Sequence, residues 1–341
     1  MTWFDESRLD DEGAWAGADL RLRALAESGG RVRREAAEAA EAIDRAAVRA
    51  TESGRPRAVV AAGPDSRLLR AVLEPVCPVP FVAWPAPGLP GWAGALDLVL
   101  VLAPDGSDVG AASAVAEANR RGCQVVVACP AGSMVAEHAE GRYATLLPVA
   151  TRDQLAIAVT VLSLLGRLSL GPAAEADDVA AALDDVAVSC SPHRDLSVNP
   201  AKLLAIALAD AVPLVWGGSV LAARAARRMA ESFRRASGRA ALAGDAEHLL
   251  PVIEGTRTRD VFDDPFDGSG EARPLLVVLD DGAGDELVLE QRRRVAETAD
   301  ARGIRVEVVA AEGGSDIARY ASLLLQGGYA AEYLRLGLVA D

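Results

Sequence analysis

Two short segments contain the residue types that proton transfer to and from a bound substrate requires. Glu231 lies in Glu231-Ser232-Phe233-Arg234-Arg235, and Asp245-Ala246-Glu247-His248 places a carboxylate beside an imidazole. A carboxylate can remove and return a proton, and a histidine can act as the acid near neutral pH. Glu247 and His248 supply both groups, although neighbouring residues on a helix or strand point in different directions. For Glu231, a solvated position on a helix is the alternative.

Four segments that follow apolar runs combine glycine with serine or aspartate. Glycine lets the backbone approach a ligand, serine or aspartate caps the next helix, and a helix start suits an anion. The same composition also serves a turn without a ligand, so both interpretations stay open. The segments are Ala62-Gly63-Pro64-Asp65-Ser66, Ala103-Pro104-Asp105-Gly106-Ser107-Asp108, Trp216-Gly217-Gly218-Ser219 and Asp280-Asp281-Gly282-Ala283-Gly284-Asp285.

Charge distinguishes two of these segments. Gly218 and Ser219 have no adjacent carboxylate, and the following helix carries arginines at 224, 227 and 228, which favours an anion. Asp105 and Asp108 would repel a phosphate at short range unless a cation or proton intervened. We therefore expect the loop at 103–108 to bind a different ligand or none.

Composition sets the elements that must position these residues. The 341 residues suffice for two domains. A composition of 51% hydrophobic but only 4% aromatic residues predicts cores of small aliphatic side chains. A net charge of −14 makes nucleic acid and membrane surfaces poor partners. The four cysteines and three histidines lack metal-ligand spacing, so we expect no metal. Without a signal-like N-terminus or a long apolar run, a cytoplasmic protein is expected.

Strands and helices alternate along most of the chain. Residues 1–53 read as an N-terminal helical segment packed on the core, 54–172 as a first α/β domain and 173–341 as a second, with a surface loop at 255–274. Runs such as Leu98–Leu102 and Leu275–Leu279 are apolar throughout, which is typical of parallel strands covered by helices on both faces. Ligands of such sheets bind beyond the carboxyl ends of the strands.

Several strings together resemble a known family. They are Leu89-Pro90-Gly91-Trp92, Asn199-Pro200-Ala201-Lys202-Leu203-Leu204-Ala205, Ala225-Ala226-Arg227-Arg228 and Gly327-Gly328-Tyr329-Ala330-Ala331-Glu332-Tyr333-Leu334. With the tandem layout, the chain resembles the bifunctional phosphoglucose/phosphomannose isomerases with two SIS (sugar isomerase) domains. The resemblance implies an α/β fold of tandem SIS domains, each a flavodoxin-like parallel sheet flanked by helices. It also implies a homodimer without a cofactor, whose site between domains and subunits binds a sugar phosphate.

The resemblance also implies roles for individual residues. Where the family has Gly-Gly-Ser, this chain has Gly63-Pro64-Asp65-Ser66. The family's phosphate-binding segment Ser-x-Ser-Gly-Asn-Thr-Glu-Glu corresponds to residues 103–110, where only Gly106 is unchanged and its neighbours are Asp105 and Ser107. The family's Gln-x-Asn-Glu-Asn falls on 231–235 with Arg234 at the glutamate's place. Its Pro-Glu-x-x-His-Asn falls near 246–251, where Glu247 matches and the histidine is displaced to His248.

Two functions remain open at this point. In the first, the protein interconverts an aldose and a ketose phosphate (glucose or mannose 6-phosphate and fructose 6-phosphate), with Glu247 or Glu231 as the base and His248 as the ring-opening acid. The remaining anion contacts would then be Ser66, Ser107 and Ser219. In the second, it binds a sugar phosphate as a regulatory or scaffold protein without turnover. A nucleotide-binding Rossmann protein is disfavoured, because no strand ends in Gly-x-Gly-x-x-Gly.

Overall fold

The chain folds into two compact units, each containing one parallel sheet. A computed structural model describes residues 2–64, 66–257 and 273–340. The first unit is Ser28–Ala180, and the second combines Met1–Glu27 with Ala181–Asp341. The sequence interpretation treated residues 1–53 as one segment, whereas the structure divides them at residue 27. Asp65 and residues 258–272, most of the expected surface loop, lie outside the described residues.

The first unit contains a five-stranded sheet in the order β3-β2-β4-β5-β6, with all neighbours parallel. The side chains of β4 are buried on both faces, as its uninterrupted apolar sequence predicts. The chain order of the strands reverses between β2 and β4, and such a reversal opens a crevice at the carboxyl ends of the two strands. The strands are β2 (Val59–Ala62), β3 (Phe81–Trp84), β4 (Leu98–Leu102), β5 (Gln124–Cys129) and β6 (Ala144–Pro148).

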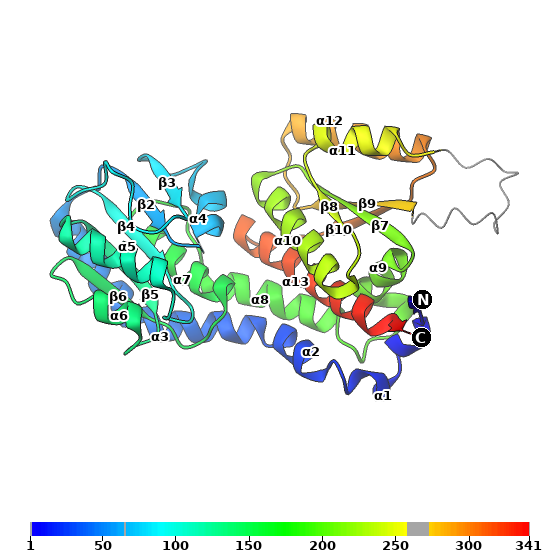
Figure 1. Ribbon diagram of the computed structural model, residues 1–341, viewed down its shortest axis with the longest axis horizontal. Coiled ribbons are helices and arrows are strands. Elements are labelled where there is room, and N and C mark those ends of the chain that lie inside the picture. The colour runs from blue at the N-terminus through cyan, green and yellow to red at the C-terminus, as the bar shows by residue number, and fades with distance from the viewer. Residues whose placement is uncertain (1, 65, 258–272, 341) are drawn as a thin grey trace, which may run out of the picture. The chain divides into compact units, whose positions relative to one another are not determined.

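Helices cover both faces of this sheet (Figure 1). The alanine-rich α5 (Val109–Arg120) and the short α6 (Met134–His138) pack with alternate residues of β4 and β5 in one aliphatic core. On the other side α7 (Gln154–Arg167) contacts β4, α4 (Ser66–Leu73) and the long α3 (Ser28–Ser53). Small side chains allow this close helix–sheet packing with very few aromatic residues.

The second unit repeats the arrangement with four parallel strands in the order β10-β9-β7-β8. The order again reverses between the first strand in sequence, β7, and the third, β9. Helices α11 and α12 pack in one core, whereas α10 packs on β7 and against α13. Helix α8 (Ala176–Ser189) begins in the first unit and ends in the second. The elements that follow it are α9 (Pro200–Leu208), β7 (Ala211–Gly217), α10 (Val220–Ser237), β8 (Leu242–Ala243), α11 (Ala246–Glu254), β9 (Arg273–Asp280), α12 (Glu286–Ala301), β10 (Val306–Ala310) and α13 (Asp316–Gly337).

The first 27 residues belong to the second unit through backbone pairing and one buried cation. Strand β1 (Thr2–Phe4) pairs antiparallel with β11 (Leu338–Ala340). A 3-10 helix (Glu6–Leu9), α1 (Glu12–Trp15) and α2 (Asp19–Ala26) follow, and both the 3-10 helix and α2 pack on α13. The short N-terminal strand was not predicted, because three residues carry no readable periodicity.

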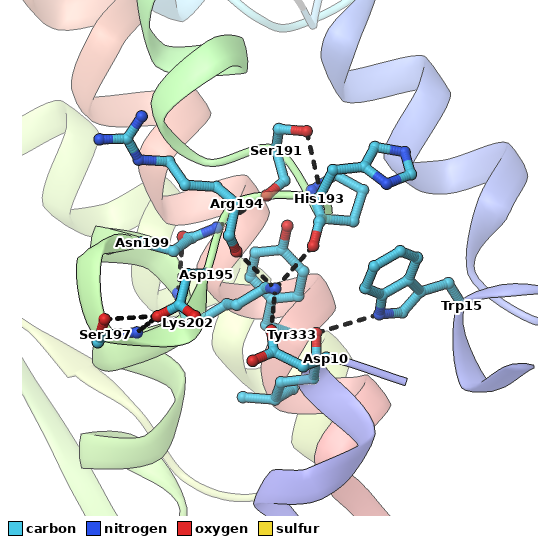
Figure 2. A network of polar contacts seen from close by, with 12 residues as sticks. Asp10, Trp15, Ser191, His193, Arg194, Asp195, Ser197, Asn199, Lys202 and Tyr333 are labelled. Carbon is cyan, nitrogen blue, oxygen red and sulfur yellow. Dashed lines mark hydrogen bonds and ion pairs between the residues drawn. The ribbon is translucent and has the colours of Figure 1, made fainter. Parts of the chain in front are cut away.

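Lys202 is the only lysine in the chain, and its side chain is completely buried. Its Nζ donates to Asp10 Oδ1 at 2.6 Å and to the carbonyl oxygens of Pro192 at 2.7 Å and Arg194 at 3.0 Å (Figure 2). The rings of Trp15 and Tyr333 lie 5.4 and 5.6 Å from the ammonium. This cage joins the N-terminal segment to the start of α9 and to α13.

Within the described residues, no helix is both long and apolar enough to cross a membrane.

Candidate functional site at the carboxyl ends of the strands

The carboxyl end of β7 leads directly into α10 through a tight Gly-Gly-Ser turn. A Cβ at Gly217 would overlap the backbone of Ala222, so only glycine allows the strand end to approach the helix this closely. Ser219 is the N-cap of α10, and its Oγ accepts a hydrogen bond from the Ala222 N–H at 2.9 Å. The same hydroxyl donates to Asp281 Oδ2. A carboxylate of the chain therefore contacts the serine that was expected to hold an anion.

Asp281 belongs to the loop that follows β9, across the reversal in strand order. Its neighbour Asp280 forms an ion pair with Arg292 at 2.5 Å and accepts the Gly282 N–H at 3.1 Å. Beside this loop lies a concavity of about 390 Å³, and Arg319 is among the residues that line it. The Arg319 guanidinium pairs with Asp316 and donates to the Gly314 carbonyl at 2.7 Å, and Asp280 and Glu312 also line the hollow.

The start of α11 brings an imidazole and two carboxylates to the same edge. Strand β8 pairs with β7 in the register Val215↔Ala243, so α11 begins beside the Gly-Gly-Ser turn. Asp245 is the N-cap, and its Oδ1 accepts the His248 N–H at 3.1 Å and contacts the His248 ring Nδ1 at 2.5 Å. Because an ionised carboxylate only accepts hydrogen bonds, Nδ1 carries the proton and Nε2 is left to face a ligand.

Electrostatics keeps Asp245 ionised. The hydrogen bonds from the His248 ring and from the His248 N–H lower the pKa of Asp245, and the positive charge of Arg227 lowers it further. Glu247 and His248 are both exposed in the first turn of α11. The structure therefore places Glu247, His248, Gly218 and Ser219 at one edge of the second sheet.

Glu231 and Arg234 lie elsewhere, in the C-terminal part of α10. Three turns separate Glu231 from the start of the helix, and Arg234 donates to the Ala241 carbonyl at 2.7 Å, just before β8 begins. Glu231 forms ion pairs with Arg228 at 2.9 Å and Arg235 at 2.5 Å. Partial burial raises the pKa of Glu231, but these arginines lower it more, to a net value below normal. Glu231 and Arg234 therefore belong to the amino-terminal side of the sheet, away from Glu247.

In the first unit, the loop after β4 is held by contacts with neighbouring residues of the chain. Asp108 is the N-cap of α5 and accepts the Ala111 N–H at 2.6 Å. Gly106 has a φ of 66°, and a Cβ there would overlap Ser133, so a larger residue would displace the loop. Asp105 and Ser107 are exposed, and Asp105 lies 3.4 Å from Arg152.

The loop after β2 contributes one buried hydroxyl. Gly63 has a φ of 91°, and Ser66 begins α4 with its side chain buried. Ser66 Oγ has no hydrogen-bond partner among the described residues. Gly63 and Ser66 follow β2 and Asp105–Ser107 follow β4, so the structure brings them to the same edge, at the reversal in strand order.

Two side chains at this edge, Asp245 and Asp281, received no role from the sequence alone. Asp245 could have been recognised from an aspartate three residues before His248 at a helix start, which is the spacing of an N-cap. The contact between Ser219 and Asp281 joins residues far apart in sequence, and no local pattern signals it. The described residues contain no cluster of histidine, cysteine, aspartate or glutamate that could hold a metal ion.

Comparison with known families finds a match within the second unit. Residues 197–338 match the family model of the bacterial phosphoglucose isomerase C-terminal SIS domain. The chain matches no curated protein sequence.

Solved structures extend the SIS fold to both units. The C-terminal domain of glucosamine-fructose-6-phosphate aminotransferase from Francisella tularensis is 12% identical, with a TM-score of 0.67 over 94% of this chain and 97% of that one. Tagatose-6-phosphate ketose/aldose isomerase from Escherichia coli is 13% identical, with a TM-score of 0.63 over 91% and 92%. A glucose-6-phosphate isomerase like protein from Thermus thermophilus is 20% identical, with a TM-score of 0.56 over 96% and 92%. The chain therefore has the α/β fold of tandem SIS domains.

Proposed function

We propose that the protein binds a sugar phosphate at the carboxyl edge of the second SIS sheet and interconverts its aldose and ketose forms. The observation that carries this proposal is the Asp245–His248 pair next to Glu247, at the edge where Ser219 begins α10. An SIS domain match in the same residues supports a sugar phosphate as the ligand.

The three side chains suit the two proton transfers of this reaction. Opening the sugar ring requires an acid at the ring oxygen. With Asp245 accepting the Nδ1–H, the imidazolium form of His248 carries its second proton on Nε2 and can donate it to that oxygen. Exchange between neighbouring carbons requires a carboxylate that removes a proton and returns it one carbon away, which is the role we assign to Glu247. Glucose, mannose and fructose 6-phosphates are the proposed substrates.

A second function is binding without turnover, and one specific observation favours it. Asp281 contacts Ser219, and in the first unit Asp108 caps α5. One carboxylate of the chain therefore caps a helix start that could receive a phosphate, another contacts the capping serine of the second such start, and both carboxylates oppose a doubly negative ligand by charge repulsion. A protein of this kind would sense a sugar phosphate weakly.

Coupled turnover of fructose 6-phosphate to glucose and mannose 6-phosphates distinguishes the two functions. Glu247→Gln and His248→Ala should each reduce turnover by about a hundredfold or more. Glu254→Gln, at the other end of α11, and His138→Ala, in the first unit, are matched controls that should retain full turnover. If the parent protein turns over no faster than buffer yet fructose 6-phosphate raises its melting temperature, binding without catalysis is the function. With neither turnover nor a shift, both functions are rejected.

A further inference from the structure

The amino-terminal edge of the first sheet contains a basic hollow that the proposed function does not use. Two adjoining concavities share Leu98, Gln124 and Leu168, at the starts of β4 and β5 and the end of α7. The larger has a volume of about 440 Å³, within the range of small-molecule sites. We call the two together the basic groove, defined by its arginines at 49, 55, 142 and 167.

These four arginines come from four separate segments. Arg49 lies on α3, Arg55 in the loop before β2, Arg142 in the loop before β6, and Arg167 at the end of α7. None of the described residues that line the groove is a carboxylate. Arg167 is paired with Asp44 at 2.5 Å, outside the lining. In a chain with a net charge of −14, this concentration of positive charge attracts anions locally.

Arg55 and Arg142 are the arginines most available to a ligand. Neither forms an ion pair with any of the described residues, and the Arg142 guanidinium lies 5.4 Å from the ring of Tyr143, which is half-exposed. A guanidinium presents two parallel N–H groups to a phosphate oxygen pair. Apolar Leu98 and Leu168 lie beside them, so the groove offers apolar contact as well as charge.

A strained residue also lines the groove. Ser169 has a φ of 55° and is the one non-glycine residue with positive φ in the part of the chain that the structure describes. It ends α7 where glycine is usual, with its N–H donating to the Gly166 carbonyl and the Leu170 N–H to the Leu165 carbonyl. Backbone strain of this type is concentrated at ligand sites, and Ser169, whose side chain carries a hydroxyl, is among the residues that line the groove.

From the arginines, the apolar floor and this hydroxyl, we propose that the basic groove binds a small organic phosphate. The groove lies at the amino-terminal ends of the strands, whereas the proposed isomerase site lies at carboxyl ends of the other sheet. Occupancy of the groove is therefore independent of the proposed function, and the ligand is a second one.

The test is calorimetric titration with phenyl phosphate, which combines an aromatic ring with a dianion, at low ionic strength. The variant R55Q/R142Q should bind about tenfold more weakly or worse, since each loses a charged hydrogen bond. Arg120→Gln, an exposed arginine on α5 outside the groove, is the control and should bind as the parent does. Ser169→Gly should fold normally and bind more weakly, because it relieves the strain but removes the hydroxyl. Added salt should weaken binding to the parent.

Two results would overturn the proposal. One is the absence of binding to the parent at millimolar phenyl phosphate. The other is equal binding by the parent and R55Q/R142Q, especially if fructose 6-phosphate competes, since the phenyl phosphate would then occupy another site. R55Q/R142Q should keep the turnover of fructose 6-phosphate, or the melting-temperature shift, that the parent shows. Failure of the groove proposal can therefore be distinguished from failure of the proposed isomerase site.

Discussion

Replacement of Lys202 by methionine provides a quantitative test of the cage in Figure 2. Methionine keeps an unbranched apolar stem but removes the ammonium. The carbonyl oxygens of Pro192 and Arg194 lose donors at 2.7 and 3.0 Å, and each loss costs about 1–2 kcal/mol. Asp10 is 47% exposed and regains water, so it adds less. Relief from burying the ammonium offsets part of the loss, and we expect a net destabilisation of about 3 kcal/mol.

Two further variants separate the ammonium from the stem. Lys202→Arg keeps the charge, but a planar guanidinium is too large for three oxygens placed around one nitrogen, so this variant should also be destabilised. Leu203→Met changes the exposed neighbour on the same helix and should stay within about 0.5 kcal/mol of the parent.

Urea unfolding, followed by tryptophan fluorescence and circular dichroism, measures these changes. The two units can unfold in separate steps, so transitions are fitted individually. With a slope of about 2–3 kcal/mol per molar urea, the Lys202→Met transition of the second unit should move down by about 1 M. A midpoint within about 0.2 M of the parent would refute the reasoning. It would mean that the free-energy cost of burying the ammonium equals the stabilisation from its hydrogen bonds and ring contacts.

Three more predictions concern other described residues. Asp97 is fully buried and accepts hydrogen bonds from Arg57 and the Gly94 N–H; burial raises its pKa, but these partners lower it to a net value below normal. The ionised Asp97 therefore stabilises the fold above the unfolded-state pKa, and this stabilisation is lost as pH falls through the folded-state pKa. Asp97→Asn should reduce the free energy of unfolding by about 2 kcal/mol at pH 7. The urea midpoints of parent and variant should converge below about pH 4. Asp281→Asn removes the charge beside Ser219 and should tighten fructose 6-phosphate binding several-fold by calorimetry; unchanged affinity would contradict the assigned repulsion. Burial raises the pKa of the Cys190 thiol to about 11. In native protein at pH 8, an aromatic disulfide reagent should therefore label the half-buried Cys77 before Cys190. Early labelling of Cys190 would contradict the packing described for the second unit.

Much of the fold could be predicted from sequence because its strands are strongly apolar. Leu98–Leu102 and Leu275–Leu279 are buried on both faces, as the continuous runs predicted. The allocation of residues 1–27 to the second unit could not be predicted. It depends on the contact between Lys202 and Asp10 and on pairing of β1 with β11, and both join residues remote in sequence.

The candidate site was predictable only where local sequence determines geometry. Ser219 begins a helix as its Gly-Gly-Ser sequence indicates, and Glu247 and His248 lie at a strand's carboxyl end. The position of Glu231 depends on the length of α10, which carries it three turns from that edge. The string Asn199-Pro200-Ala201-Lys202 supported the family resemblance, yet in the structure Asn199 caps α9 and Lys202 forms the cage. These residues therefore stabilise the SIS domain rather than contact a ligand.

Because Lys202 is the single lysine of the chain and its side chain is buried, the folded protein offers no accessible ε-amine. Acylating reagents directed at lysine can modify position 202 only after the cage opens. The rate of that single modification therefore measures how often the second unit opens under native conditions, without denaturant and without an introduced probe.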